Sequence, residues 1–155
     1  MNGEINSNTL ADFNRLIQNY PNIKLINTKE VPGSSDDQVN LQVSKRVFDL
    51  GIATHLMDNG EIASGGVDFF IAGVKRTIGA NTKIGVHSWS DGSQDATAFP
   101  VGHANHLPYI NYYISVGFTQ QQAENFYYFT INAAPASSIH WMTEAEIIQY
   151  GLIKN

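Results

Sequence analysis

The sequence predicts an α/β domain, in which strands and helices alternate along the chain and pack in layers. Short apolar runs bounded by turn residues alternate with segments of helical periodicity, and 43% of the 155 residues are apolar. No internal repeat, low-complexity tract or linker divides the chain. A chain of this length can bury about two thirds of its unfolded surface. We therefore expect one domain over residues 1–155.

Local signals predict the elements of the first half of the chain in order. Polar caps and turn residues bound segments whose apolar residues recur at helical or strand spacing. The elements predicted in this way are a helix from Ser7 or Asn8 to Asn19, a strand over 23–27, a helix that Asp36 or Asp37 caps and that runs to Leu50, a strand over 52–57 followed by a turn at 58–60, and an apolar helix from Ser64 through Ile71.

The second half continues the alternation around a long irregular loop. Residues 88–108 are polar and contain glycine, so they favour no regular element. The elements predicted on either side are short strands over 76–78 and 83–87, a helix over 109–116, a helix capped by Thr119 and running through Phe129, and a final helix capped by Thr143 with Glu144 and Glu146 in its first turn.

Composition and charge exclude several classes of function. The net charge is −5 and no basic run exceeds two residues, which disfavours nucleic-acid binding. No apolar stretch approaches the roughly 20 residues that span a bilayer, and no signal-peptide pattern stands at the N-terminus. Cysteine is absent, which excludes disulfides and thiolate chemistry. The localisation stays open, although the Asn-rich, Lys-poor composition favours an exported or periplasmic protein over a cytoplasmic one.

Two residues have positions suited to nucleophilic catalysis. Ser64 has small neighbours and stands where an apolar helix begins, so the N–H of Gly65 would point toward an oxyanion formed on attack. His87 closes a short apolar strand at the start of a loop, where a histidine can accept a serine proton near neutral pH. The alternatives are that Ser64 only caps the helix and that His87 is a hydrogen-bonded structural residue.

Four motifs in order resemble the proteolytic subunit of the Clp protease, over nearly the whole chain from residue 3 to residue 153. Ser64 stands 23 residues before His87, close to the spacing of nucleophile and base in that family. The motifs are Pro32-Gly33-Ser34, which is similar to an oxyanion loop, Ala63-Ser64-Gly65-Gly66, the stretch from Gly73-Val74-Lys75-Arg76 through Asn81 to Ile84-Gly85-Val86-His87, and the closing Trp141-Met142-Thr143-Glu144-Ala145-Glu146 with Tyr150-Gly151-Leu152-Ile153.

The resemblance implies a ClpP/crotonase-like spiral of repeated ββα units and the activity of a serine peptidase. Ser64 would be the nucleophile and His87 the base, with Gly65, Ser34 and Gly33 forming the oxyanion hole. The substrate would be a peptide or protein, and no cofactor or metal is implied. The aromatic-rich region 109–129 would contribute partly to the core and partly to contacts that join copies of the chain in a homo-oligomer. The nearest match is to the bacterial predicted-periplasmic relatives of the Clp subunit.

The sequence departs from the family at two places. The Gly-Gly loop has become Gly33-Ser34, and serine tolerates a positive φ poorly. The third catalytic residue of the family is an aspartate shortly before the closing helix, and this chain has no acid there. We expect Asn132 to orient the His87 ring instead, since an asparagine fills this role in Cys-His-Asn sites. The other candidates for this position are Thr130, Ser137, Ser138 and the position of Ile139.

Other functions stay open beside the peptidase. The missing acid is compatible with a catalytically weak or inactive Clp-like scaffold or peptide-binding protein. A crotonase-like acyl-thioester enzyme is a further reading, and a Ser-Lys site would need Lys75, at the far end of the helix after Ser64. His103 and His106 could hold a metal with a third ligand, and the candidates for that ligand are His140, Asp91 and Asp95. We favour a substrate-lining or solvated loop for this pair.

Overall fold

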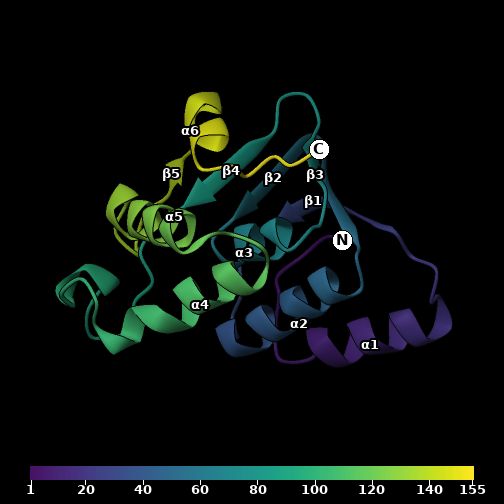
Figure 1. Ribbon diagram of the computed structural model, residues 1–155, viewed down its shortest axis with the longest axis horizontal. Helices are drawn as coiled ribbons and strands as arrows, with labels where there is room; N and C mark the ends of the chain where they lie inside the picture. Colours follow the sequence, from purple (N-terminus) through teal and green to yellow (C-terminus); the bar gives the residue numbers. More distant parts are fainter.

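A twisted sheet runs through the centre of the computed structural model, which describes residues 1–155 (Figure 1). Its strands follow the order β1-β2-β4-β5, and β3 also pairs with β2. The pairs that β2 makes are parallel, whereas β4 and β5 are antiparallel. The elements in chain order are α1 (Thr9–Asn19), β1 (Leu25–Val31), α2 (Asp37–Asp49), β2 (Ala53–Ala63), α3 (Gly65–Ile71), β3 (Arg76–Ile78), β4 (Lys83–Val86), α4 (Leu107–Ser115), α5 (Gln120–Ala133), β5 (His140–Trp141) and α6 (Glu144–Gln149), with short 3₁₀ turns at Ala96–Ala98 and Ala104–His106.

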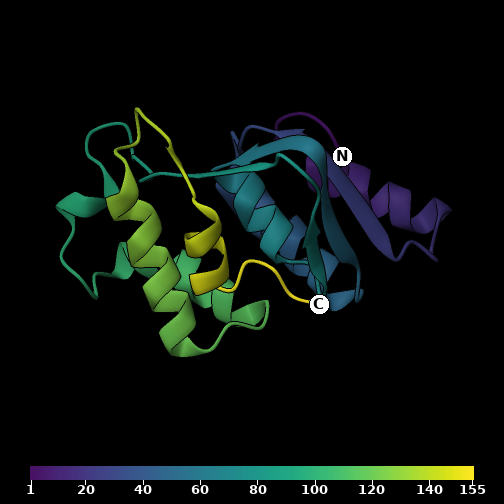
Figure 2. The ribbon, with the colours of Figure 1, turned by 90° about the horizontal axis from the view of Figure 1, so that it is seen from above.

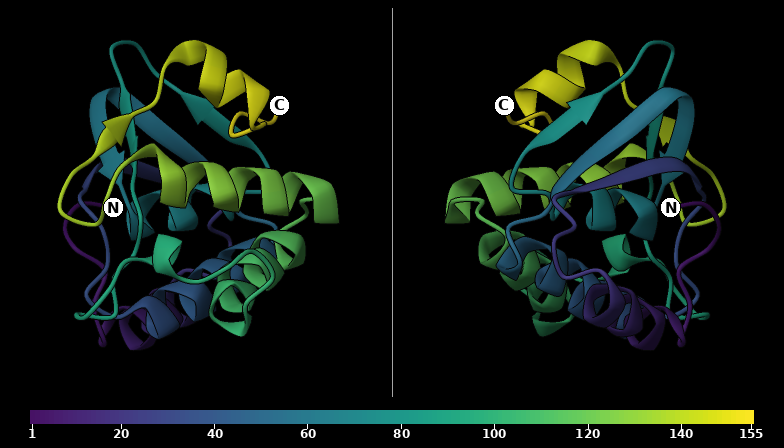
Figure 3. Two further views of the ribbon diagram at one scale, coloured as in Figure 1. Left: turned by 90° about the vertical axis from the view of Figure 1, so that its left-hand side faces the viewer. Right: turned by 90° about the vertical axis from the view of Figure 1, so that its right-hand side faces the viewer.

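The helices surround this sheet unevenly. Helix α3 packs between β2 and α2, and α1 packs on the outer side of α2. Helices α4 and α5 contact one another at the end of the molecule opposite α1 (Figure 2). Figure 3 shows α5 lying between α6 and α4. One connected apolar core of 28 buried residues runs from Ile5 to Leu152, so elements from both halves of the chain depend on the same packing.

Strand β2 is longer than the sequence predicts, and the predicted turn at 58–60 is wrong. These residues belong to β2, whose first half pairs with β3 and whose second half pairs with β4. Asn59 has φ 55°, and the pairing with β1 shifts register between Thr28 and Glu30. A bulge of this kind bends a strand without reversing it, which explains why the turn residues do not end β2.

The predicted helix boundaries agree with the structure where a side chain caps the helix. Asp36 accepts a bond from the N–H of Val39 at 3.0 Å, and Thr119 and Thr143 each form a capping box. Helix α4 begins at Leu107, two residues before the predicted start, and strand β5 was not predicted at all. A two-residue strand has too short a pattern to be recognised from sequence.

Small residues let α3 approach β1 closely. A Cβ atom on Gly66 would lie 2.4 Å from the carbonyl oxygen of Val31, at the end of β1. The first turn of α3 therefore packs directly against the strand, and this contact fixes the position of the residue before it, Ser64.

No helix of the chain has the length and apolar character needed to cross a membrane.

Replacing Gly66 by alanine is expected to destabilise the fold, because the added methyl group must displace the β1 backbone. Overpacking of this kind costs about 1–3 kcal/mol. The free energy of unfolding, measured by urea titration, should fall accordingly although alanine is the better helix former. An unchanged or higher free energy of unfolding would show that the β1–α3 contact is not constrained.

Candidate active site

Ser64 occupies a strained turn between strand β2 and helix α3. Its backbone has φ 52° and ψ −129°, and the other non-glycine residues with positive φ are asparagines, Asn59 and Asn81. Asparagine tolerates this region, whereas serine rarely enters it, and such a conformation costs about 1–3 kcal/mol. Although Ser64 is the residue before α3, its side chain makes no capping bond. The Ser64 hydroxyl therefore does not cap α3, which disagrees with the alternative that Ser64 serves only as a helix cap.

His87 follows β4 directly, and its neighbour selects one tautomer of the ring. Its Nδ1 lies 2.7 Å from the carbonyl oxygen of Ser88. A carbonyl oxygen only accepts hydrogen bonds, so this contact favours the tautomer of the neutral ring that carries its proton on Nδ1 and its lone pair on Nε2. Ser88 is itself fixed, since its N–H donates to Ala134 and its hydroxyl accepts from Ala96. This is the form of the ring that a general base requires.

Ser64 and His87 line the same cavity, which has a volume of about 50 Å³. No hydrogen bond joins the serine hydroxyl to the histidine ring, and the Ser64 side chain has no other hydrogen-bond partner. Catalytic hydrogen bonds are often long without substrate and tighten when it binds. The structure therefore brings the predicted nucleophile and base into one environment.

The predicted oxyanion residues lie against Ser64. A Cβ atom on Gly33 would lie 3.3 Å from the Cβ of Ser64, and Gly33 has φ 152°, a conformation that favours glycine. Ser34 has no positive φ, so the Gly-to-Ser change falls where serine is tolerated. The N–H of Ser34 has no acceptor in the protein, and that of Gly65, the first residue of α3, has none within its helix. Two N–H donors are thus available beside the hydroxyl.

The structure does not bring Asn132 to the histidine. The exposed side chain of Asn132 donates to the carbonyl of Tyr128 at 2.7 Å, because α5 continues to Ala133 and turns this residue outward. Thr130 lines the cavity but its hydroxyl donates to Tyr127, and Ser137 and Ser138 are exposed. The ring N–H of His87 donates to the Ser88 backbone instead, and a backbone carbonyl leaves no signal in the sequence.

Sequence reasoning missed an acidic group in the same cavity. Asp68 lies one turn after Ser64 on α3, is half-buried, and accepts a bond from the Tyr113 hydroxyl at 2.9 Å. Burial raises the pKa of Asp68 to about 7, the hydroxyl of Tyr113 opposes this shift, and the nearby charge of Asp37 adds to it. The sequence does contain a sign of this arrangement: Asp68 follows Ser64 by four residues, a spacing that places two side chains on the same face of a helix.

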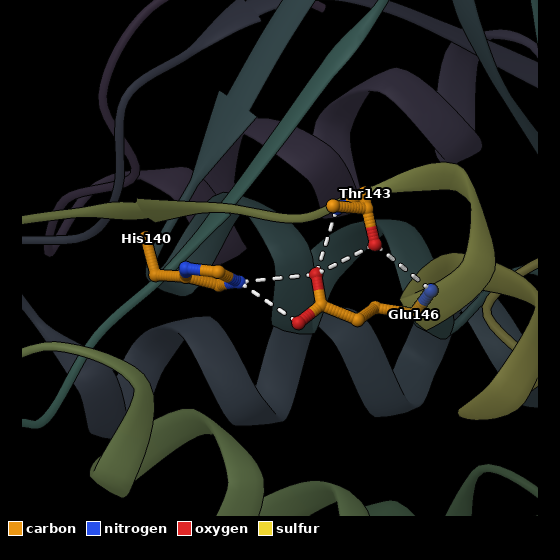
Figure 4. Close-up of polar contacts among 3 residues, drawn as sticks. All are labelled: His140, Thr143 and Glu146. Carbon is orange, nitrogen blue, oxygen red and sulfur yellow. Dashed lines mark hydrogen bonds and ion pairs between the residues drawn. The ribbon is translucent and has the colours of Figure 1, made fainter.

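The segment after α5 anchors the strand that pairs with β4. In the register of β4 and β5, His140 lies opposite Val86, the residue before His87. The Nε2 atom of His140 lies 3.0 and 3.1 Å from the carboxylate oxygens of Glu146, which also accepts the N–H of Thr143 at 2.7 Å (Figure 4). These bonds lower the pKa of Glu146, the backbone bond from Thr143 most of all. The start of α6 thereby fixes β5 beside the end of β4, where His87 follows.

The histidines considered as metal ligands serve other contacts. His106 is fully buried, with Nδ1 2.7 Å from the Tyr127 hydroxyl, and Nδ1 of His103 accepts the N–H of Asn105. No three His, Cys, Asp or Glu side chains come together in a geometry that could hold a metal ion. Lys75 is exposed, and the cavity of Ser64 contains no lysine. A Ser-Lys pair is therefore not formed with that residue.

Comparison with solved structures finds many neighbours with the same fold, and two of them are mutants of a protein described as the 1510-N membrane-bound stomatin-specific protease. A lysine-to-alanine mutant in complex with a substrate peptide has a TM-score of 0.62 and 21% identity, over 99% of this chain and 70% of the other. A serine-to-alanine mutant has a TM-score of 0.61 and 19% identity, over 99% of this chain and 74% of the other.

These neighbours confirm the predicted α/β fold of the Clp-like proteases. They lend no support to the nearer match with predicted-periplasmic Clp relatives or to a crotonase-like enzyme. No protein-family model matches the sequence, and no curated protein matches it either.

Exchanging Ser64 for glycine should stabilise the protein relative to Ser64→Ala. Glycine adopts φ 52° without strain, whereas alanine keeps the Cβ atom that causes it. We expect the free energy of unfolding of Ser64→Gly to exceed that of Ser64→Ala by about 1 kcal/mol, measured by urea titration of both variants. If the glycine variant is the less stable of the two, the turn is not strained.

The raised pKa of Asp68 predicts a loss of stability as the pH rises from about 4 to about 7. In this window the folded state holds a proton that the unfolded state has released, so deprotonation favours unfolding. Asp68→Asn removes the titration, and the wild type should lose on the order of 1–3 kcal/mol more than this variant between pH 4 and pH 8. Chemical denaturation at both pH values checks this.

The matched control for this comparison is Asp12→Asn, which alters an exposed carboxylate on α1 that pairs with Arg15. Its stability profile should run parallel to that of the wild type. An Asp68→Asn profile that is also parallel to the wild type would contradict the assignment of this titration to Asp68.

Proposed function

We propose that this protein is a serine peptidase of Clp-like fold that uses Ser64 and His87. The observation that carries the proposal is the strained backbone of Ser64, which leaves its hydroxyl uncapped in the cavity that His87 also lines. Strain of this kind persists only where the surrounding structure enforces it, and it concentrates at functional sites. A strained serine on a strand-to-helix turn is also how α/β-hydrolases present their nucleophile.

In this mechanism the Ser64 hydroxyl attacks the carbonyl carbon of a peptide bond while its proton passes to Nε2 of His87. The N–H groups of Gly65 and Ser34 receive the oxyanion, and Gly33 gives the loop its shape. His87 then returns the proton to the leaving amine, and water hydrolyses the acyl-serine by the same path. The Ser88 carbonyl takes the orienting role expected of Asn132. A neutral carbonyl stabilises the imidazolium less than a carboxylate does, so turnover should be slow.

The second candidate is an inactive peptide-binding or scaffold protein of the same fold. Two observations favour it: Ser64 makes no hydrogen bond to His87, and no carboxylate supports the ring. An acyl-thioester enzyme of the crotonase type is less well supported. The cavity is lined by two aspartates and by no lysine or arginine, so it offers nothing to the phosphates of a coenzyme-A group.

We also infer that residues 1–155 act as one domain and that copies of the chain associate through the region of α4 and α5. Most of the aromatic residues in this region are buried in the core, as predicted for part of the cluster, among them Tyr112, Tyr113 and Phe126. Val101 and Leu107 remain exposed beside them and are the apolar side chains available for such contact. A solution mass measurement by light scattering distinguishes monomer from oligomer.

Hydrolysis of an unstructured protein such as casein, together with a small activated ester, tests the peptidase. Ser64→Ala and His87→Ala are each expected to lower kcat/KM by a factor of about 100 or more. Ser138→Ala, an exposed serine outside the cavity, is the matched control and should retain wild-type activity. Activity that survives in Ser64→Ala would refute the proposal, and a folded wild type inactive on every substrate would favour the scaffold.

A further inference from the structure

One carboxylate oxygen in the cavity beside Ser64 is left without a protein partner. Oδ1 of Asp68 accepts the Tyr113 hydroxyl, whereas no hydrogen bond reaches Oδ2. Every fully buried side-chain oxygen of the protein has a partner, so Oδ2 must retain accessible surface. Asp68 also lines the cavity that Ser64 and His87 share.

No lysine or arginine in the cavity pairs with this carboxylate. The titratable carboxyl and imidazole groups in its lining are Asp37, Asp68 and His87. Both oxygens of Asp37 are already used, by the hydroxyls of Ser34 and Tyr109. Desolvation, together with the nearby charge of Asp37, raises the pKa of Asp68 and so disfavours its ionised form. A cation brought into the cavity would remove this penalty, since an opposite charge nearby favours the ionised form.

The walls of the cavity suit the rest of a cationic side chain. Trp89, Tyr109 and Tyr127 stack in succession, with ring centroids 6.3 and 5.9 Å apart and interplanar angles of 15° and 21°. Trp89 donates to the Tyr127 hydroxyl, which in turn donates to the buried His106, so the rings are held in place. These rings stack mainly on one another, and the parts of them that line the cavity offer apolar surface for the stem of a lysine or arginine side chain.

We infer that Asp68 makes this cavity a specificity pocket for a lysine or arginine side chain next to the peptide bond that Ser64 cleaves. This inference rests on the proposed peptidase function. Asp68 pairs with the charged end of the substrate side chain, and the aromatic rings flank its stem. An acidic side chain is excluded by repulsion from Asp68 and Asp37, and a neutral side chain of equal length leaves the carboxylate unpaired.

Binding to the inactive Ser64→Ala variant tests the pocket without requiring turnover. The probes are fluorescent peptides of one alanine- and glycine-rich sequence whose central residue is lysine, arginine, norleucine or glutamate. At pH 8, where Asp68 is ionised, the lysine and arginine peptides should bind about tenfold or more tightly than the norleucine peptide by anisotropy. Equal binding of lysine and norleucine peptides, or no binding of either basic peptide, would overturn the inference.

Adding Asp68→Asn to Ser64→Ala should abolish the preference for basic peptides while leaving the affinity for norleucine within about twofold, since asparagine is uncharged. Adding Asp12→Asn instead removes a distant charge and should leave the preference intact. A preference that survives Asp68→Asn would overturn the assignment to this residue. The comparison of peptides in Ser64→Ala alone still decides the matter if the double variant does not fold.

The same peptides separate this inference from the proposed activity. If Ser64→Ala prefers basic peptides but the wild type cleaves none of them, the result supports a binding pocket for basic side chains and refutes the proposed peptidase activity. If the wild type cleaves all neutral and basic peptides at equal kcat/KM, the peptidase stands and the specificity pocket is refuted.

Discussion

The close packing of the β2–α3 turn is the constraint on which the rest of the site depends. Gly66 lets α3 approach Val31, Gly33 leaves room for Ser64, and a Cβ on Gly65 would clash with the side chain of Ser34. The buried amide of Asn40 donates to the Gly65 carbonyl at 2.9 Å and holds the turn from the side of α2. These contacts hold Ser64 in a backbone conformation that serine rarely adopts, and its hydroxyl makes no capping bond to α3.

The other parts of the cavity follow from this turn and from the β4–β5 pair. Helical spacing carries Asp68 to the same face as Ser64, where Tyr113 and Asp37 meet it from α4 and α2. The Ser88 carbonyl after β4 accepts a hydrogen bond from Nδ1 of His87, and the bonds of Glu146 to His140 and Thr143 hold the partner strand in place. Residues from widely separated parts of the chain thus converge on one small acidic and aromatic cavity.

Much of this arrangement could be predicted from the sequence, because local chemistry determines it. The caps at Asp36, Thr119 and Thr143 use side-chain oxygens that are visible in the sequence, and the small residues around Ser64 indicate a close approach. The rest depends on tertiary contacts. Asn59 occurs within a bent strand because β2 pairs with two partners, and the turn composition there carries no information about that pairing.

The third residue of the site shows the same limit. Counting along the chain leads to Ile139 or to Thr130 and Asn132, and the chemistry of asparagine favours Asn132. The length of α5 turns the Asn132 side chain to solvent, and the Ser88 carbonyl accepts the His87 ring N–H instead. Asp68 escaped notice because one acid within an apolar helix resembles an ordinary first-turn residue. Its significance depends on the tyrosine hydroxyls and the second aspartate, which only the fold brings together.

Mass-spectrometric mapping of a fluorophosphonate adduct tests most directly the claim that the strained turn presents a nucleophile to a base. We predict modification of the intact protein at one residue, Ser64, with a rate that falls strongly when His87 is replaced by alanine. A folded protein that stays unmodified at Ser64, or that is modified there equally fast without His87, would contradict the account.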